Sequence, residues 1–168
     1  MNADGSDPQR LLPQAGTSGA YEQPEWSPDG QLLAFVCLEV APDGVDAAVC
    51  VAAADGSDEP RTLTPPDGSD CFSPRFAPDG RDLAFVCYRQ GSEGGDVYVA
   101  SIEGDDTRQL TTTGDVPMQG TIGGIWSTSG NELYLRRANR LWTVRTDGTG
   151  LTPLAFDKLD GAFDLRFE

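Results

Sequence analysis

The stretch WSPDGQLLAF at residues 26–35 decides the fold, because close copies of it return at a regular interval along the chain. The second copy reads FAPDGRDLAF at 76–85, and the third reads WSTSGNELYL at 126–135. Repeats with a period of about 50 residues are typical of architectures in which each unit buries its apolar face against the next unit. The sequence therefore predicts an array of similar units.

The most regular copy divides into four short strands. Residues 72–76 form the expected first strand, and the turn at 77–80 contains a Pro that sets φ and a Gly that accepts positive φ. The apolar run 83–88 suits a strand buried on both faces, 97–100 is strongly β-prone, and 107–111 alternates like an outer strand. Four antiparallel strands in about 40–50 residues are typical of a β-propeller blade.

The predicted fold class is all-β, with three complete four-stranded antiparallel β-propeller blades and one orphan strand at each end. Residues 4–12 match 55–63, so the chain opens on the outer strand of a preceding blade. Residues 163–167 match the first strand of the second copy, so the chain ends on an inner strand. Propellers contain about 4–8 blades, so we expect either a segment of a larger propeller or a chain that pairs with another copy. The expected units are 1–20 (outer strand), 21–66, 67–114 and 115–157 (blades), and 158–168 (inner strand).

The charge excludes several classes of partner. Asp and Glu number 27 against 12 Lys and Arg, which gives a net charge of −15 with no histidine. Such an acidic field repels phosphate, so neither nucleic acid nor an anionic membrane surface is expected. No stretch approaches the roughly 20 apolar residues of a membrane-spanning helix, and residues 1–7 do not resemble a signal peptide. The protein is cytoplasmic, has lost a targeting segment, or is part of a longer chain.

The sequence offers no catalytic machinery. Without histidine, Ser-His-Asp and Cys-His arrangements are impossible, and no phosphate-binding loop or dinucleotide fingerprint is present. We therefore expect no enzyme and no cofactor. The turn residues Asp29 and Asp79 are interpreted as capping their own turns. The Asp-Gly-Ser-Asp runs at 4–7, 55–58 and 67–70 leave calcium open as an alternative to tight turns.

The repeat also explains the aromatic and cysteine residues. Trp26 shares its repeat position with Phe and Trp in the other copies, so these aromatic side chains are expected to fill the wedge between stacked sheets. The four cysteines lack Cys-x-x-Cys spacing, and there is no histidine to complete a zinc site. Each is interpreted as a small apolar residue of a blade. A Cys37–Cys50 disulfide between neighbouring strands is left open for an oxidising compartment.

Partner recognition is expected at one rim of the array. In an up-and-down blade, the first and second turns lie at one rim, and these are stereotyped Pro-Asp-Gly and Asp-Gly turns. The opposite rim carries the more variable loops 39–46, 89–95 and 138–140 and the connections 65–70 and 112–124. Variable loops on a rigid scaffold are where recognition usually lies. The candidate partner-facing residues are Glu39, Asp43, Asp46, Arg89, Gln90, Glu93, Asp115, Met118, Gln119, Ile122 and Arg140.

The pattern Trp-Ser-Pro-Asp-Gly, Leu-Ala-Phe, Val-Tyr-Val, Asp-Gly and Arg-x-Leu-Thr resembles the WD40-like repeats of the TolB β-propeller family. Similar repeats occur in the propeller domains of prolyl-oligopeptidase and tricorn-type peptidases. The TolB likeness implies a periplasmic or extracellular, non-enzymatic module that binds a protein or peptide. The alternative is the gating propeller of a serine peptidase whose catalytic domain is absent from this chain. The third copy departs from the family, because Thr128-Ser129 replaces Pro-Asp.

Overall fold

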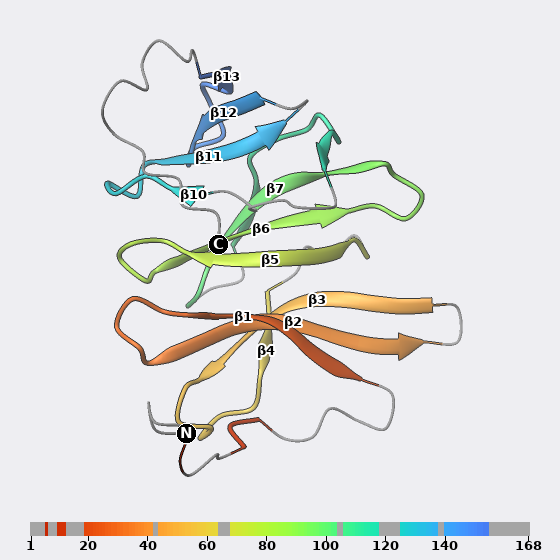
Figure 1. Ribbon diagram of the computed structural model, residues 1–168, viewed down its shortest axis with the longest axis vertical. Helices are drawn as coiled ribbons and strands as arrows, with labels where there is room; N and C mark the ends of the chain where they lie inside the picture. The colour runs from red at the N-terminus through yellow and green to blue at the C-terminus, as the bar shows by residue number, and fades with distance from the viewer. Residues whose placement is uncertain are drawn as a thin grey trace.

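The computed structural model describes residues 6, 10–12, 19–41, 44–63, 68–103, 106–117, 125–137 and 140–154. Within these ranges every regular element is a β-strand, and all strand pairs are antiparallel (Figure 1). No helix that could cross a membrane is found in this part of the chain.

The strands form three sheets that follow one another along the chain, each in simple sequential order. Figure 1 shows them in that order along the long axis of the molecule. An additional strand, β9, pairs with β7 beside β8. The first sheet holds β1 (Ala20–Trp26), β2 (Leu32–Ala41), β3 (Gly44–Ala53) and β4 (Arg61–Thr62). The second holds β5 (Asp70–Phe76), β6 (Asp82–Tyr88), β7 (Gly94–Ser101), β8 (Thr107–Gln109) and β9 (Val116–Pro117), and the third holds β10 (Ile125–Trp126), β11 (Glu132–Arg137), β12 (Arg140–Arg145) and β13 (Thr152–Pro153).

This architecture confirms the predicted all-β, partial β-propeller fold, and we refer to the three sheets as blades 1, 2 and 3. The predicted inner strand at the C-terminus lies outside the described residues. Of the predicted N-terminal outer strand, residues 10–12 are described; they are not in a strand, and Leu12 packs against the core of blade 1.

The repeated turn between the first and second strands has the same geometry in all three blades. Gly30, Gly80 and Gly130 have φ values of 71°, 73° and 72°. Each donates its N–H to the carbonyl three residues earlier at 2.9 Å. In the third copy, Ser127 Oγ lies 3.2 Å from Ser129 Oγ, so a hydroxyl takes the place of the turn carboxylate. The Thr-Ser substitution therefore leaves the turn intact.

The main core lies between the blades. Successive side chains of a strand point to opposite faces, so the central strand β6 packs against both neighbouring blades, as its continuous apolar run predicts. Between blades 1 and 2 the core contains Ala34, Val49, Val51 and Leu63 against Cys71, Phe76, Leu83, Phe85, Cys87, Tyr98 and Ala100. Between blades 2 and 3 it contains Ala84, Val86, Tyr88, Val97, Val99, Leu110 and Val116 against Leu133, Leu135 and Val144.

One predicted core aromatic residue is exposed. Trp26 is 55% exposed, whereas Phe76 at the same repeat position is 7% exposed. Phe76 packs against the preceding blade, but the described residues place no blade before blade 1. The repeat pattern was therefore wrong for Trp26, because burial at this position depends on the preceding unit.

The cysteines form two disulfides, so their interpretation as small apolar residues without a bond is corrected. Cys37 is bonded to Cys50, with Cα atoms 6.0 Å apart, which confirms the alternative left open above. Cys71 is bonded to Cys87, with Cα atoms 4.1 Å apart, and this pair was not predicted. Cys71 lies directly opposite Cys87 in the β5–β6 ladder. Their sulfur atoms therefore meet on one face of the same sheet.

Candidate functional site

The blades present two rims of different character. The first rim, which we call the turn rim, carries the β1–β2 type turns and the turns after the third strands. The other, which we call the loop rim, carries the β2–β3 type hairpins and the connections between blades. The predicted partner-facing residues that the structure describes belong to the loop rim.

In blade 1, the predicted loop 39–46 is largely a hairpin. Glu39 pairs with Asp46, and Val40 pairs with Val45, so the ladder continues almost to the tip. Val40 is 58% exposed and Val45 is 53% exposed, and the acidic side chains beside them are exposed as well. The hairpin therefore carries an apolar pair flanked by two carboxylates. The alternation of Glu39-Val40 and Val45-Asp46 around a Pro-Asp-Gly turn is the sequence signal that was missed.

In blade 2, the loop between β6 and β7 is closed by its own hydrogen bonds. Ser92 donates to the carbonyl of Arg89 from its N–H at 3.0 Å and from its hydroxyl at 2.7 Å. Arg89, Gln90 and Glu93 are exposed. This loop therefore presents charged and amide side chains from a turn of fixed shape.

The connection after blade 2 is held on the scaffold by Asp96. Its carboxylate accepts hydrogen bonds from Thr111 Oγ1 at 2.9 Å, from Gly114 N at 3.0 Å and from Gln109 Nε2 at 3.2 Å. The connection then pairs with β7 as β9, where Val116 is fully buried. Asp96 of β7 therefore holds three points of the segment that leads from β8 into this connection.

Asp115, a predicted partner-facing residue, has a structural role. Its carboxylate accepts hydrogen bonds from the hydroxyl of Thr113 and from Nε of Arg137 in blade 3. Burial raises the pKa of Asp115, but these hydrogen bonds and the Arg137 charge outweigh burial, so its pKa lies below the ordinary value. Arg137 also lies with its guanidinium carbon 4.6 Å from the ring centroid of Trp142. Asp115 therefore ties the connection to blade 3.

The third hairpin is basic where the first is acidic. Arg140 is exposed and lies opposite Arg137 in the β11–β12 ladder. The remaining candidate residues, Asp43, Met118, Gln119 and Ile122, lie outside the described residues. Among the described residues of the predicted loops, Glu39, Asp46, Arg89, Gln90, Glu93 and Arg140 lie at the loop rim and are exposed.

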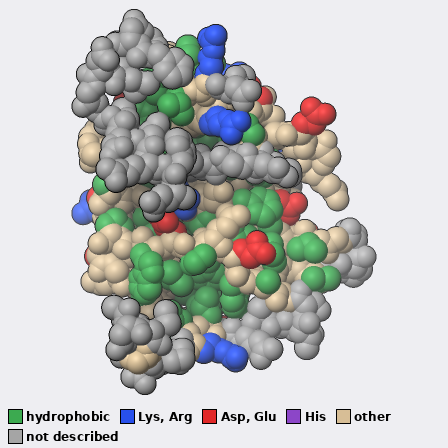
Figure 2. Space-filling model, in the orientation of Figure 1, with side chains coloured by type: hydrophobic (Ala, Val, Ile, Leu, Met, Phe, Trp, Pro, Cys, Tyr) green, Lys and Arg blue, Asp and Glu red, His purple; other side chains and the backbone are tan. Residues whose placement is uncertain are grey.

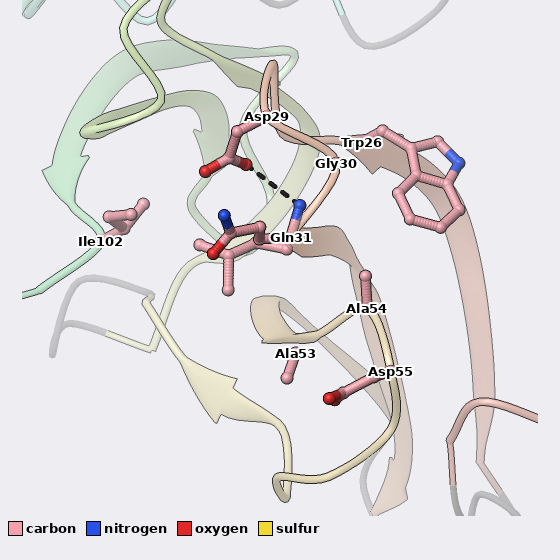
Figure 3. Close-up of a pocket in the computed structure, with 9 residues that line it drawn as sticks. Trp26, Asp29, Gly30, Gln31, Ala53, Ala54, Asp55 and Ile102 are labelled. Carbon is pink, nitrogen blue, oxygen red and sulfur yellow. Dashed lines mark hydrogen bonds between the residues drawn. The ribbon is translucent and has the colours of Figure 1, made fainter.

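A recess of about 720 Å³ lies at the turn rim, on the side opposite the predicted partner face (Figure 3). Trp26, Asp29 and Asp55 are among its lining residues. Asp29 accepts hydrogen bonds from the hydroxyl of Ser27 at 2.7 Å and from the N–H of Gln31 at 3.0 Å, and these lower its pKa. Asp29 therefore caps its own turn, as predicted.

Asp79 and Asp55 cap their turns in the same way, whereas Asp70 makes a contact between blades. Asp79 accepts a hydrogen bond from the N–H of Arg81 at 3.0 Å. Asp55, from one of the candidate calcium runs, accepts the N–H of Ser57 at 2.9 Å, and hydrogen bonds from Ser57 lower its pKa. Asp70, from another run, accepts the N–H of Ala47 across the interface between blades at 2.9 Å. Among the residues with described positions, no group of three or more His, Cys, Asp or Glu side chains could hold a metal ion.

No protein-family model matches the sequence, and no match was found among curated proteins. The structure is similar to solved β-propellers. TolB from Acinetobacter baumannii has 20% identity, with 79% of this chain and 31% of that chain covered and a TM-score of 0.55. A puromycin-hydrolyzing peptidase from Mycobacterium tuberculosis has 22% identity, with 89% of this chain and 26% of that chain covered and a TM-score of 0.67.

A third similar structure is the β-propeller domain of the Trilobed protease from Pyrococcus furiosus, at 14% identity. It covers 83% of this chain and 44% of that chain, with a TM-score of 0.62. The chain thus spans less than half the length of each of these three structures. At these identities the likeness shows the fold, which TolB and peptidase propellers share. By fold, this chain is a β-propeller module.

Proposed function

We propose that this chain is a non-enzymatic, TolB-like interaction module that binds a protein or peptide through the loop rim. The observation that carries the proposal is the exposed Val40–Val45 pair at the hairpin tip of blade 1. The Cys37–Cys50 disulfide joins the two strands of this hairpin. Apolar side chains held in water by a rigid hairpin are suited to a partner that covers them.

The charges of the loop rim favour one orientation of a bound segment along the rim. Glu39 and Asp46 flank the valine pair in blade 1, whereas the exposed Arg140 lies in the hairpin of blade 3. Complementary charges guide association and suppress wrong orientations. We therefore expect a bound segment to place basic residues over blade 1 and acidic residues toward blade 3.

Selection from a phage-displayed peptide library tests the proposal. Peptides selected on the wild-type chain should bind at least about tenfold more weakly to the Val40→Ser/Val45→Ser variant, because a few central apolar side chains carry most of a binding energy. The matched control is Ile125→Ser, which removes an exposed apolar side chain of β10 away from this hairpin. Equal binding of all selected peptides to both variants would contradict the proposal.

The alternative function is the gating propeller of a prolyl-oligopeptidase or tricorn-type serine peptidase. The observation in its favour is that the puromycin-hydrolyzing peptidase matches 89% of this chain with a TM-score of 0.67, against 0.55 for TolB. The reading frame on both sides of the coding sequence distinguishes the two functions. A downstream Gly-x-Ser-x-Gly segment supports the peptidase, and an upstream signal sequence supports the interaction module.

We further propose a periplasmic or extracellular location, supported by the two disulfides. Structural disulfides persist in oxidising compartments and are rare in the cytosol. Alkylation of free thiols in freshly extracted protein, followed by mass measurement, tests this point. Labelling of all four cysteines without a reductant would argue for a reducing compartment.

A further inference from the structure

The β2–β3 hairpin of blade 1 extends past the short outer strand β4 (Figure 1). At the end of β4, the N–H of Leu63 donates to the carbonyl of Val49 at 2.8 Å. The next contact toward the hairpin tip is the hydrogen bond from the N–H of Ala47 to Oδ1 of Asp70 at 2.9 Å. Beyond it, no strand of the described ranges pairs with this outer edge of β3.

The backbone groups at this edge are directed outward. In an antiparallel ladder the N–H and C=O of one residue point to the same edge, and successive residues alternate between the two edges. Val49 and Ala47 use the outer edge, so Val45 uses it as well. The carbonyl of Ala47 and both backbone groups of Val45 therefore point outward, and none of them bonds to another described residue. An edge of this kind can pair with another strand.

In blade 2 the chain itself supplies a strand at the corresponding edge. The ladders of the two blades align Asp46 and Ala47 with Gly94 and Gly95. In blade 2 the strand β9 pairs antiparallel with these two glycines and buries Val116 completely. The edge of a third strand in this fold is therefore able to accept a further strand at the loop rim.

The folded connection of blade 2 does not fit on blade 1. A Cβ placed on Gly94 would lie 2.6 Å from the carbonyl oxygen of Gly114 and 2.9 Å from Cα of Asp115, in the turn that precedes β9. Asp46 carries a Cβ at this place. A segment that folds over β3 as this turn folds over β7 would therefore collide with Asp46, whereas a straight segment avoids the collision.

The side chains along the edge specify the chemistry of such a segment. Ala47 and Val45 lie on one face of β3, and their exposure rises from 5% to 53% toward the tip. Val40 lies opposite Val45 on this face, and Figure 2 shows hydrophobic side chains on the surface of blade 1 out to this hairpin. An apolar residue opposite Val45 extends the row of valines. The next residue lies opposite Asp46, whose cross-strand neighbour is Glu39, so a basic residue suits that position.

We propose that the outer edge of β3, from Val45 to Ala47, binds an extended segment of a partner protein as an additional antiparallel strand. The segment alternates apolar residues with Lys or Arg. The proposal rests on the proposed function and names the way in which the loop rim holds its partner. A second copy of the chain does not suit this edge, because pairing two such edges would bring Glu39 and Asp46 of both copies together in a protein of net charge −15.

NMR of the isotope-labelled full chain with the capped peptide Lys-Val-Lys-Val-Lys tests the proposal. Hydrogen exchange of the Val45 amide should slow at least about tenfold in saturating peptide, because a hydrogen-bonded amide is protected. The amide of Val40 points to the opposite edge of the hairpin and should keep its exchange rate. The same peptide N-methylated at both valines should bind at least about tenfold more weakly, because the donors that face β3 are lost. The matched control is N-methylation of two lysines, whose methyl groups point away from β3 and should leave the affinity unchanged.

A pair of charge variants gives a second readout. Asp46→Lys should weaken binding of the peptide at least about threefold, because a cross-strand pair of opposite charges becomes one of like charges. Asp58→Lys makes the same change in total charge at an exposed position of the turn rim and should have little effect. Equal affinities of the two methylated peptides, an unchanged exchange rate of Val45, or no binding of the parent peptide would overturn the proposal. If library-selected peptides still depended on the valine pair, the proposed function would stand without the strand pairing; if they did not, the proposed function would fail as well.

Discussion

Removal of either disulfide should destabilise the chain by a similar amount. The sequence separations are 13 residues for Cys37–Cys50 and 16 residues for Cys71–Cys87. The loss of loop-closure entropy in the unfolded state gives about 3 kcal/mol for each closed loop of this size. The free energy of unfolding of a domain is usually about 5–15 kcal/mol, so the stabilisation by one disulfide is a large fraction of it.

Urea unfolding, followed by tryptophan fluorescence, measures the effect. With a slope of about 2 kcal/mol/M, loss of one bridge lowers the midpoint by about 1.5 M. The variants are Cys37→Ala/Cys50→Ala and Cys71→Ala/Cys87→Ala. Alanine is preferred to serine because a buried hydroxyl would add the cost of an unsatisfied hydrogen bond.

The control is the variant with all four cysteines replaced, whose midpoint should not respond to a reducing agent. A wild-type midpoint that does not move on reduction would refute the reasoning. Four thiols titrating in urea without reductant would do the same. The cysteines would then be apolar side chains of the blades and nothing more.

The remaining predictions concern contacts between and beside the blades. Asp96→Ala should lower the free energy of unfolding in urea by about 2–4 kcal/mol, because it removes three hydrogen bonds to one carboxylate. Asp96→Asn should lower it by less, and equal losses for the two variants would contradict this account. Trp126→Phe should cost about 1 kcal/mol, measured in the same way, because it removes the bond to the Arg75 carbonyl and keeps the aromatic ring. Because the pKa of Asp115 is lowered in the folded state, its carboxylate adds to the free energy of unfolding. This stabilisation should be fully present at pH values well above the ordinary Asp pKa of 3.8, and it should be lost as the pH falls through the lowered pKa. Thermal unfolding of wild type and Arg137→Gln from pH 6 to pH 2 measures this, and a difference in melting temperature that grows toward low pH would contradict it.

Most of the fold was predictable because the repeat carries it. The turn residues Asp29 and Gly30 have local roles that depend on a few neighbours along the chain, so the sequence predicts them without knowledge of tertiary structure. The apolar run 83–88 indicated a strand buried on both faces, and β6 is such a strand. Local chemistry and periodicity agree in these segments, and such agreement makes a prediction strong.

The misses concern positions where the neighbour decides the outcome. Trp26 has the same repeat position as Phe76, but only the latter has a preceding blade among the described residues. The Cys71–Cys87 bond depends on the register between two strands, which the repeat alignment of single positions does not give. The predicted loop 39–46 is a hairpin because β2 and β3 pair as far as Ala41 and Gly44, and this pairing is a contact between strands that a comparison of single repeat positions does not give.

One repeat position shows how the blades differ within a common backbone. Cys37, Cys87 and Arg137 occupy the same place on the second strand of each blade. Cys37 is bonded to the third strand, Cys87 is bonded to the first strand, and Arg137 lies over Trp142 while pairing with Asp115. Cys87 and Arg137 lie at the loop-rim end of their strands, and Cys37 lies at the middle of the longer strand β2. The two disulfides therefore fasten blades 1 and 2 within their own sheets, whereas Arg137 fastens blade 3 to the connection that follows blade 2.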